Sequence, residues 1–185
     1  MFDNFKKYRQ ERVLRTLTGE KRTKRIAHLD EVHDMGIIFN VGSEAEWNTL
    51  YGFVREMERS GKQVWLIGFQ ANKQVIEYIF THPRTTIIHE KEDLTYFGLP
   101  KEGVIEGFAH RHFDLLIDTT PLHDFFSLYV ANKCIADLKV TYLCGDEPHS
   151  PYTEKSYDLL LHGDKPLELS AYIAEIKRYL TMIKK

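Results

Sequence analysis

The chain has 185 residues, of which 43% are hydrophobic and 12% aromatic, so it can bury one substantial core and fits the usual size of a single domain. Its formal net charge of -2 and pI near 6.5 exclude a global attraction to nucleic acid or anionic lipid, because a strong basic excess usually meets such partners. The two cysteines, Cys134 and Cys144, have neither C-x-x-C nor zinc-type spacing, so the sequence indicates no disulfide framework and no structural zinc site. We expect neither a cofactor nor a metal.

The hydropathy of the chain bears on its location. No apolar run approaches the roughly 18 residues that cross a bilayer, and the opening stretch "MFDNFKKYRQERV" lacks the apolar core of a signal peptide. We therefore expect a cytoplasmic protein without a membrane span.

Residues 1–25 differ in composition from the rest of the chain. They hold nine Lys and Arg against three acidic residues, together with an irregular apolar face. This pattern predicts a basic amphipathic helix that ends near Gly19. Such a helix either packs its apolar side on the domain or serves as an arm that binds nucleic acid or a partner.

Short apolar runs alternate with helical periodicity over the remaining residues, 26–185. The runs that predict strands are 36–41, 64–69, 85–90, 113–118, 138–144 and 157–163. Ser43 and Glu46 form a capping box that starts a helix with a stop near Gly61. Further helices are expected around Val75 to Phe80, ending before Pro83, around Val104 to Phe108, from Thr120 and Pro121 through the apolar residues between Phe125 and Cys134, and from about Leu167 to the carboxyl end.

Continuous apolar strands that alternate with helices imply a parallel sheet covered on both faces. We therefore predict a single Rossmann-like α/β domain, a three-layer sandwich with a mostly parallel sheet of about six strands. Right-handed crossovers make 3-2-1-4-5-6 the expected strand order.

Asp118 stands out because it ends the apolar fourth strand. In an open parallel sheet, ligands bind beyond the carboxyl ends of the strands where the strand order reverses, which here brings Asp118 opposite the end of the first strand. Thr120 followed by Pro121 resembles a helix N-cap and first helical position. The candidate ligand-binding residues are Asn40, Gly42, Ser43, Asp118, Thr119 and Thr120, and Asp118 is the best candidate for catalysis. Alternatively, Asp118 only caps the turn that holds Thr119 and Thr120.

The expected site has an acidic mouth. The predicted strand ends carry Glu44, Glu46, Asp118, Asp124, Asp146 and Glu147 against Lys73 as the one firm cation, and neither G-x-G-x-x-G nor G-x-x-x-x-G-K-[ST] occurs. A helix N-terminus stabilises an anion by about 0.3 to 1 kcal/mol, whereas one carboxylate about 6 Å away opposes it by roughly 3 kcal/mol at an effective dielectric near 20. We expect weak or absent binding of dinucleotides and nucleoside triphosphates.

Three further constellations are weak signals. His110, His112 and Asp114 imitate a metal cluster but lie at the amino end of the fourth strand, the wrong edge for a site in this fold. The pair His123 and Asp124 imitates a base with its orienting acid. Cys144 closes the fifth strand without a fixed cation beside it to lower its pKa, so an idle thiol is expected.

Four segments, "MGIIFNV", "KEDLTYFGLPKEGVIEGF", "FDLLIDTT" and "YDLLLHGDKPLELSAYIAEIKRYLTMIKK", resemble a family of small bacterial proteins known as a domain of unknown function. That resemblance covers most of the chain and implies no catalytic residue. Locally, "FDLLIDTTPLHDFFSLYVANKCIADLKV" resembles the strand-helix-strand unit in the acceptor-side domain of heptosyltransferases, whose second domain holds most of the sugar nucleotide.

These observations leave three functions open. The first is a non-catalytic module that binds a protein partner or a small ligand, favoured because no phosphate loop, nucleophile elbow or convincing metal set occurs. The second is a glycosyltransferase-like enzyme or remnant, with Asp118 as general base towards a sugar hydroxyl. The third is nucleic-acid binding through the basic amino-terminal helix. On balance the sequence favours a protein that is not an enzyme.

Overall fold

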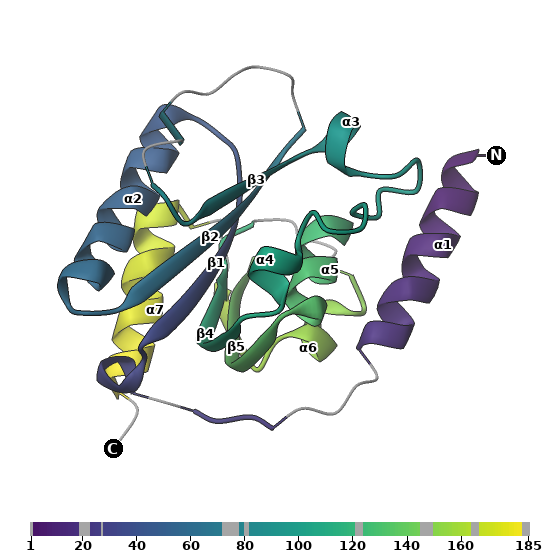
Figure 1. The fold of residues 1–185 in the computed structure, drawn as a ribbon. Helices are drawn as coiled ribbons and strands as arrows, with labels where there is room; N and C mark the ends of the chain where they lie inside the picture. Colours follow the sequence, from purple (N-terminus) through teal and green to yellow (C-terminus); the bar gives the residue numbers. More distant parts are fainter. Residues whose placement is uncertain are drawn as a thin grey trace.

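A six-stranded, all-parallel sheet forms the centre of the molecule. The computed structural model describes residues 2–18, 23–26, 28–71, 78–79, 82–120, 124–144, 150–163 and 167–182. The strand order is β3-β2-β1-β4-β5-β6 (Figure 1), which confirms the expected order 3-2-1-4-5-6. The strands are β1 (Asp34–Asn40), β2 (Gln63–Gln70), β3 (Thr85–His89), β4 (His112–Asp118), β5 (Ile135–Cys144) and β6 (Leu159–Gly163).

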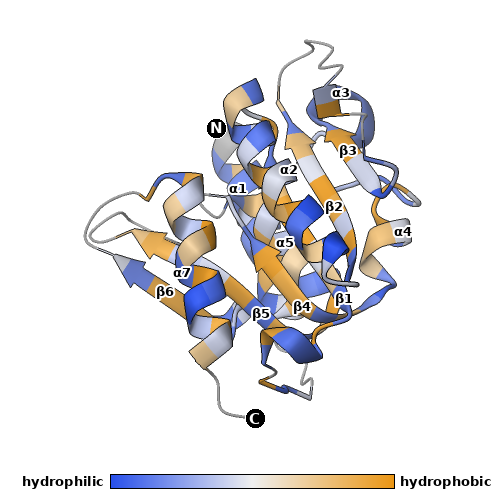
Figure 2. Ribbon diagram, turned by 90° about the vertical axis from the view of Figure 1, so that its left-hand side faces the viewer, coloured by the Kyte–Doolittle hydropathy of each residue, from blue (hydrophilic) through white to orange (hydrophobic). Residues whose placement is uncertain are grey.

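The central strands β1 and β4 are buried on both faces. Adjacent residues of one strand point to opposite sides of a sheet, and both Ile37 and Ile38 of β1 have no exposed surface. The same holds for Leu115 and Leu116 of β4. This explains why these strands are mostly apolar rather than alternating, with Asp114 as the polar exception inside β4. In Figure 2 the apolar colour predominates on the strands of the sheet.

Helices α2 (Glu44–Arg59) and α7 (Leu169–Met182) cover one face of the sheet, with the short helix η1 (Leu29–Glu31) beside α7. The expected capping box starts α2. The Ser43 hydroxyl accepts a hydrogen bond from the Glu46 backbone N–H, and the Glu46 carboxylate accepts one from the Ser43 backbone N–H. Both helices direct one apolar stripe onto β1, β2, β4 and β5, which makes the first core.

Helices α1 (Phe2–Leu17), α5 (Phe125–Lys133), α4 (Glu106–Ala109) and α6 (Thr153–Ser156) lie over the other face. Leu14 of α1 is buried, and it belongs to a second core with the apolar side of α5. The helix expected from the basic amino-terminal composition thus exists, ends at Leu17 and packs its apolar side on the domain.

Some expected elements differ in extent. Val104 and Ile105 precede α4 rather than lying inside it, since the helix starts only at Glu106. The one-turn helices α3 (Glu90–Asp93) and α6 were not predicted, because a single turn is too short to show a helical period. The helix expected around Val75 to Phe80 lies mostly outside the described residues. Of the helices that the structure describes, none has the length and apolar character that crossing a bilayer requires.

Candidate functional site

The carboxyl ends of β1 and β4 meet at the point where the strand order reverses. Ile38 of β1 is in register with Asp118 of β4. Just beyond the strand, the backbone N–H and the hydroxyl of Thr119 both donate to the Ile38 carbonyl, each at 2.9 Å. The sequence argument that brought the first and fourth strands side by side in parallel is therefore confirmed.

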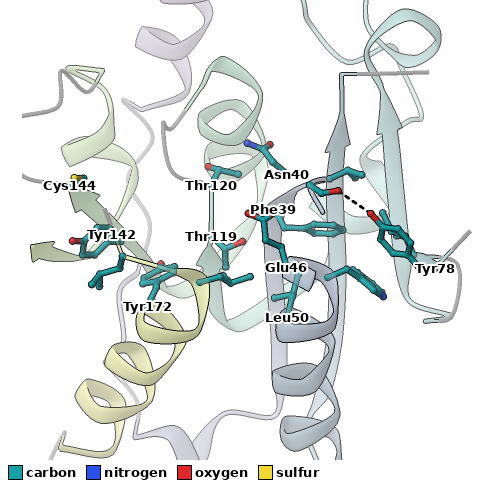
Figure 3. Close-up of a pocket in the computed structure, with 16 residues that line it drawn as sticks. Phe39, Asn40, Glu46, Leu50, Tyr78, Thr119, Thr120, Tyr142, Cys144 and Tyr172 are labelled. Carbon is teal, nitrogen blue, oxygen red and sulfur yellow. Dashed lines mark hydrogen bonds between the residues drawn. The ribbon is translucent and has the colours of Figure 1, made fainter. Parts of the chain in front are cut away.

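A cavity of about 430 Å³ opens at this edge, between the ends of the strands, α2 and α7 (Figure 3). Its lining residues come from five segments of the chain: Phe39, Asn40, Val41, Gly42, Glu46, Trp47, Leu50, Tyr78, Ile79, Thr119, Thr120, Tyr142, Cys144, Leu167, Leu169 and Tyr172. We call this cavity the strand-end pocket.

Aromatic rings form much of the pocket wall. On the α2 side, the ring centroids of Trp47 and Phe39 are 5.7 Å apart, and Trp47 stacks on Tyr51 with ring centroids 5.6 Å apart. On the α7 side, the rings of Tyr142 and Tyr172 are 5.7 Å apart. Both walls are fixed by packing in the first core, so the pocket is largely formed without a ligand.

The polar groups of the pocket gather where α2 begins. Glu46 Oε2 accepts hydrogen bonds from the backbone N–H of Ser43 at 2.7 Å and from its hydroxyl at 2.9 Å. The Tyr78 hydroxyl donates to the Gly42 carbonyl at 3.0 Å. A Cβ on Gly42 would lie 2.2 Å from Glu46 Oε2, so a larger residue at this position would displace the Glu46 carboxylate from the cap.

The electrostatic character of the described lining is negative. Glu46 is the only Asp, Glu, Lys or Arg side chain among the described residues that line the pocket. Desolvation, together with the neighbouring carboxylates of Glu44 and Glu46, raises the pKa of Tyr78. A ligand that carries negative charge would meet the same repulsion.

Asp118 does not reach this pocket. Its side chain is completely buried, and Oδ1 accepts from the Thr120 backbone N–H at 2.8 Å and the Thr120 hydroxyl at 2.6 Å. Oδ2 accepts from the hydroxyl of Tyr157. The structure thus gives Asp118 the alternative role expected from the sequence, holding the turn after β4, and does not offer the open carboxylate that a general base would need.

The Asp118 backbone carbonyl extends this network towards the pocket. It accepts from the Tyr172 hydroxyl at 2.7 Å and the Thr141 hydroxyl at 3.2 Å. Burial, followed by the adjacent Asp118 charge, raises the pKa of both Tyr157 and Tyr172 well above the usual range of a phenol. Tyr172 therefore joins the buried network to the pocket wall.

The expectation that Thr120 caps the next helix is wrong. Helix α5 starts at Phe125, and Asp124 caps it by accepting from the Ser127 backbone N–H at 2.9 Å. Thr120 instead bonds back to Asp118 in a local turn, a competition with helix formation that short polar side chains favour. The cap of α5 therefore lies six residues after Asp118 rather than two.

The structure brings together Asn40, Gly42, Thr119 and Thr120 of the candidate ligand-binding residues, all on the pocket lining. Ser43 is outside the lining and caps α2. Of the acidic mouth, Glu46 lines the pocket and Asp124 caps α5, while Asp146, Glu147 and Lys73 lie outside the described residues.

Sequence reasoning missed the aromatic wall. Trp47 occurs at helical spacing, which predicts a core residue. Tyr142 of β5 and Tyr172 of α7 come into contact with each other only in the folded structure. The signal that could have revealed this wall is the number of aromatic residues near the predicted strand ends. Residue spacing alone does not distinguish such pocket residues from aromatic residues of the core.

The other constellations have structural partners. His112 pairs with Asp137 at 2.8 Å, and Asp114 accepts from the backbone N–H groups of His33 and Asp34. Among the described residues, no group of three or more His, Cys, Asp or Glu is arranged to hold a metal ion. His123 lies outside those residues.

The two thiols differ in environment. Cys134 is buried, and desolvation raises its pKa to about 12, a shift that Lys139 opposes. Cys144 is half-buried and lines the strand-end pocket.

Comparisons with known proteins agree with the resemblance noted in the sequence. A family model described as a family of unknown function (DUF6913) matches residues 6–183, which span α1, the whole sheet and α7. A search of curated proteins found no match, so the local likeness to heptosyltransferases stays a prediction.

Proposed function

We propose that this chain, which belongs to the DUF6913 family of unknown function, is a non-catalytic module that binds a small organic molecule, uncharged or cationic, in the strand-end pocket. The observation that carries this proposal is the pocket itself: a preformed aromatic cavity at the topological switch point, with few polar groups and a carboxylate at its rim. Open α/β sheets bind their ligands at this place.

The size and wall chemistry of the pocket support a small ligand rather than a macromolecule. Its volume of about 430 Å³ falls within the range of roughly 300–1,000 Å³ that is typical of small-molecule sites. Asn40, Thr119 and Thr120 supply a few polar groups beside the apolar wall. In small-molecule sites such polar groups usually fix the orientation of the ligand, while the apolar wall buries most of its surface.

The charge distribution supports a neutral or cationic ligand. Glu46 is the only acidic or basic side chain in the described lining, and the faces of aromatic rings attract organic cations. No phosphate-binding glycine loop precedes α2, where Ser43 and Glu46 form the cap instead. This arrangement disfavours nucleotides, as the sequence led us to expect.

The sugar-transfer alternative needs a carboxylate that reaches a substrate hydroxyl. Asp118 is sealed by Thr120 and Tyr157, so no observation favours that function and we do not propose it.

A single-tryptophan variant tests the proposal directly. The chain has two tryptophans, Trp47 in the pocket and Trp65, which packs against the second core. In Trp65→Phe, the emission of Trp47 should therefore report occupancy of the pocket. Titration with benzyltrimethylammonium, benzyl alcohol and benzoate compares a cation, a neutral molecule and an anion that share an aromatic ring.

We expect saturable changes with benzyltrimethylammonium and benzyl alcohol and none with benzoate. Glu46→Gln keeps the side-chain size and should weaken binding of the cation about fivefold, because unit charges about 4 Å apart contribute about 1 kcal/mol in a water-like dielectric. Binding of benzyl alcohol should stay unchanged. Equal binding of all three probes, or tightest binding of benzoate, would overturn the proposed ligand chemistry.

A further inference from the structure

We propose that helix α1 is a second binding surface, which takes single-stranded nucleic acid on its outward side. The surface consists of Phe5, Tyr8, Arg9, Arg12 and Arg15, and we call it the α1 outer face. All five side chains are exposed, with 55% exposure for Phe5 and 63% for Tyr8.

Helical spacing places these five residues together. Each of the positions 5, 8, 9, 12 and 15 lies three or four residues from another of the set, so together they form one stripe along the helix. The opposite side of α1 is used by the fold, because Leu14 is buried in the second core and Gln10 Nε2 donates to the Phe97 carbonyl at 2.8 Å. The outer face is therefore held towards solvent.

The chemistry of this face is unusual for a protein with a net negative charge. It contains three arginines and two aromatic rings, and the exposed Glu11, three residues after Tyr8 and four before Arg15, borders it. Arg12 and Arg15 have no ion-pair partner in the part of the chain that the structure describes. Guanidinium groups bind phosphates in a bidentate manner and stack on planar rings.

Phe97, in the turn that follows Leu94, packs against the amino-terminal half of this surface and holds its side chains in place. Phe97 contacts Phe5 edge-on with centroids 5.8 Å apart, and the guanidinium carbon of Arg9 lies 4.6 Å from its ring centre. Tyr96, which is 69% exposed, packs edge-on against the same ring at 5.4 Å. Exposed aromatic rings on a fixed support can stack unpaired bases while arginines neutralise the backbone.

A membrane surface fits these observations less well. A helix that lies in a bilayer interface inserts a broad apolar face, but the apolar side of α1 is already packed on α5. Only Phe5 and Tyr8 would be left to insert. Double-stranded DNA or RNA would use the arginines but leave the exposed rings without unpaired bases to stack on.

The surface is also separate from the strand-end pocket. Helix α1 lies over α5, on the opposite face of the sheet from α2 and α7 (Figure 1). Since salt screens charges beyond about 10 Å, the local arginines act independently of the distant acidic groups. This inference therefore goes beyond the proposed function, and each can fail without the other.

Fluorescence anisotropy with a labelled oligouridine of about 15 nucleotides tests the inference on the full chain. If the three arginines each neutralise a phosphate, the slope of log affinity against log salt should be about -2, so affinity should fall about 20-fold between about 50 mM and about 200 mM salt. Arg12→Glu combined with Arg15→Glu should reduce the affinity at least about tenfold and leave a slope between about -0.7 and zero.

The matched control reverses two exposed arginines of α2, Arg55→Glu with Arg59→Glu, and changes the net charge by the same amount. It should bind as the unaltered protein does. Circular dichroism checks that each variant is folded. If the charge reversal disturbs folding, the double variant Arg12→Gln with Arg15→Gln replaces it and should likewise lose affinity.

Stacking is tested at Tyr8. Tyr8→Ala should weaken oligouridine binding about fivefold, whereas Tyr8→Phe retains the ring and should bind normally. No salt-sensitive binding, equal loss in the α2 control, preference for a duplex of the same length, or binding only to vesicles that contain phosphatidylserine would each overturn the inference.

Discussion

At the scale of single residues, Asp118 shows how a buried carboxylate is accommodated at the end of an apolar strand. Three donors from Thr120 and Tyr157 surround its oxygens, and within the described residues its side chain forms no ion pair. Transfer of a carboxylate from water is costly unless hydrogen bonds replace its hydration. The network therefore stabilises the turn from which Thr119 and Thr120 enter the pocket.

Removing this carboxylate should destabilise the fold. Asp118→Ala leaves buried donors on Thr120 and Tyr157 without an acceptor, at about 1 to 3 kcal/mol for each, so the free energy of unfolding should fall by about 3 to 5 kcal/mol. Asp118→Asn keeps one acceptor oxygen and should lose about half as much. Urea denaturation followed by circular dichroism measures both, and equal stability of Asp118→Ala and the unaltered protein would contradict this account.

The same network predicts a loss of stability in alkali. Since the pKa values of Tyr157 and Tyr172 are raised above 10.0 in the folded protein, the unfolded chain releases these protons first as the pH rises. Their contribution is constant below about pH 10 and declines above it by about 1.4 kcal/mol per pH unit for each tyrosine.

Denaturation at several pH values between about 9 and about 11.5 measures that decline. Tyr172→Phe should remove one tyrosine's share of the slope. The control is Tyr96→Phe, at an exposed side chain outside the network, and an equal effect of the two variants would argue against the buried tyrosines as the cause.

At the scale of elements, α1 has two sides with different tasks. Its inward side supplies Leu14 to the second core, while the outward side holds the arginines on which the nucleic-acid proposal depends. Helix propensity and charge were visible in the sequence, but the side of the helix that faces α5 follows from the position of α5 on the sheet.

This division predicts different costs for two leucines of α1. Leu14 is 4% exposed, so Leu14→Ala should lower the free energy of unfolding by about 2 to 4 kcal/mol, the usual cost of a buried cavity. Leu17 is only partly buried, and Leu17→Ala should cost about 1 kcal/mol or less. Chemical denaturation compares them, and equal costs would mean that α1 does not dock through Leu14.

At the scale of the whole molecule, the order of the strands decides where a ligand can bind. The chain leaves β1 towards β2 and β3 on one side and returns to β4, β5 and β6 on the other. Helices α2 and α7 then line the pocket at the point where the strand order reverses. These helices are far apart in sequence and pack together in the first core.

The global packing also predicts different reactivity for the two cysteines. Cys134 is sealed in the second core and has a raised pKa of about 12, whereas Cys144 lines the pocket. A water-soluble aromatic disulfide reagent should modify one thiol quickly in the folded protein and both after denaturation.

Cys144→Ser identifies the reactive thiol, because it should abolish the fast phase, and benzyltrimethylammonium should slow that phase in the unaltered protein. Fast modification that persists in Cys144→Ser would contradict the assigned burial of Cys134.

Much of the architecture followed from the sequence alone. The apolar runs located every strand of the described sheet, since burial on both faces leaves few polar positions within a central strand. Crossover handedness then led to the correct strand order, and Ser43 with Glu46 marked the start of α2. Short helices such as α6 and the true start of α5 were missed, because one turn has no period and Thr120 had a competing partner in Asp118.

The candidate site shows where sequence reasoning reached its limit. Its position and the contributions of Asn40, Gly42, Thr119 and Thr120 were determined by strand ends that are local features of the chain. Whether Asp118 faced a ligand or the interior, and whether Tyr172 was core or pocket wall, depended on side chains more than 30 residues away that packing brings into contact. Local periodicity reports which residues are apolar, whereas only the packed tertiary structure decides which of them enclose an empty volume.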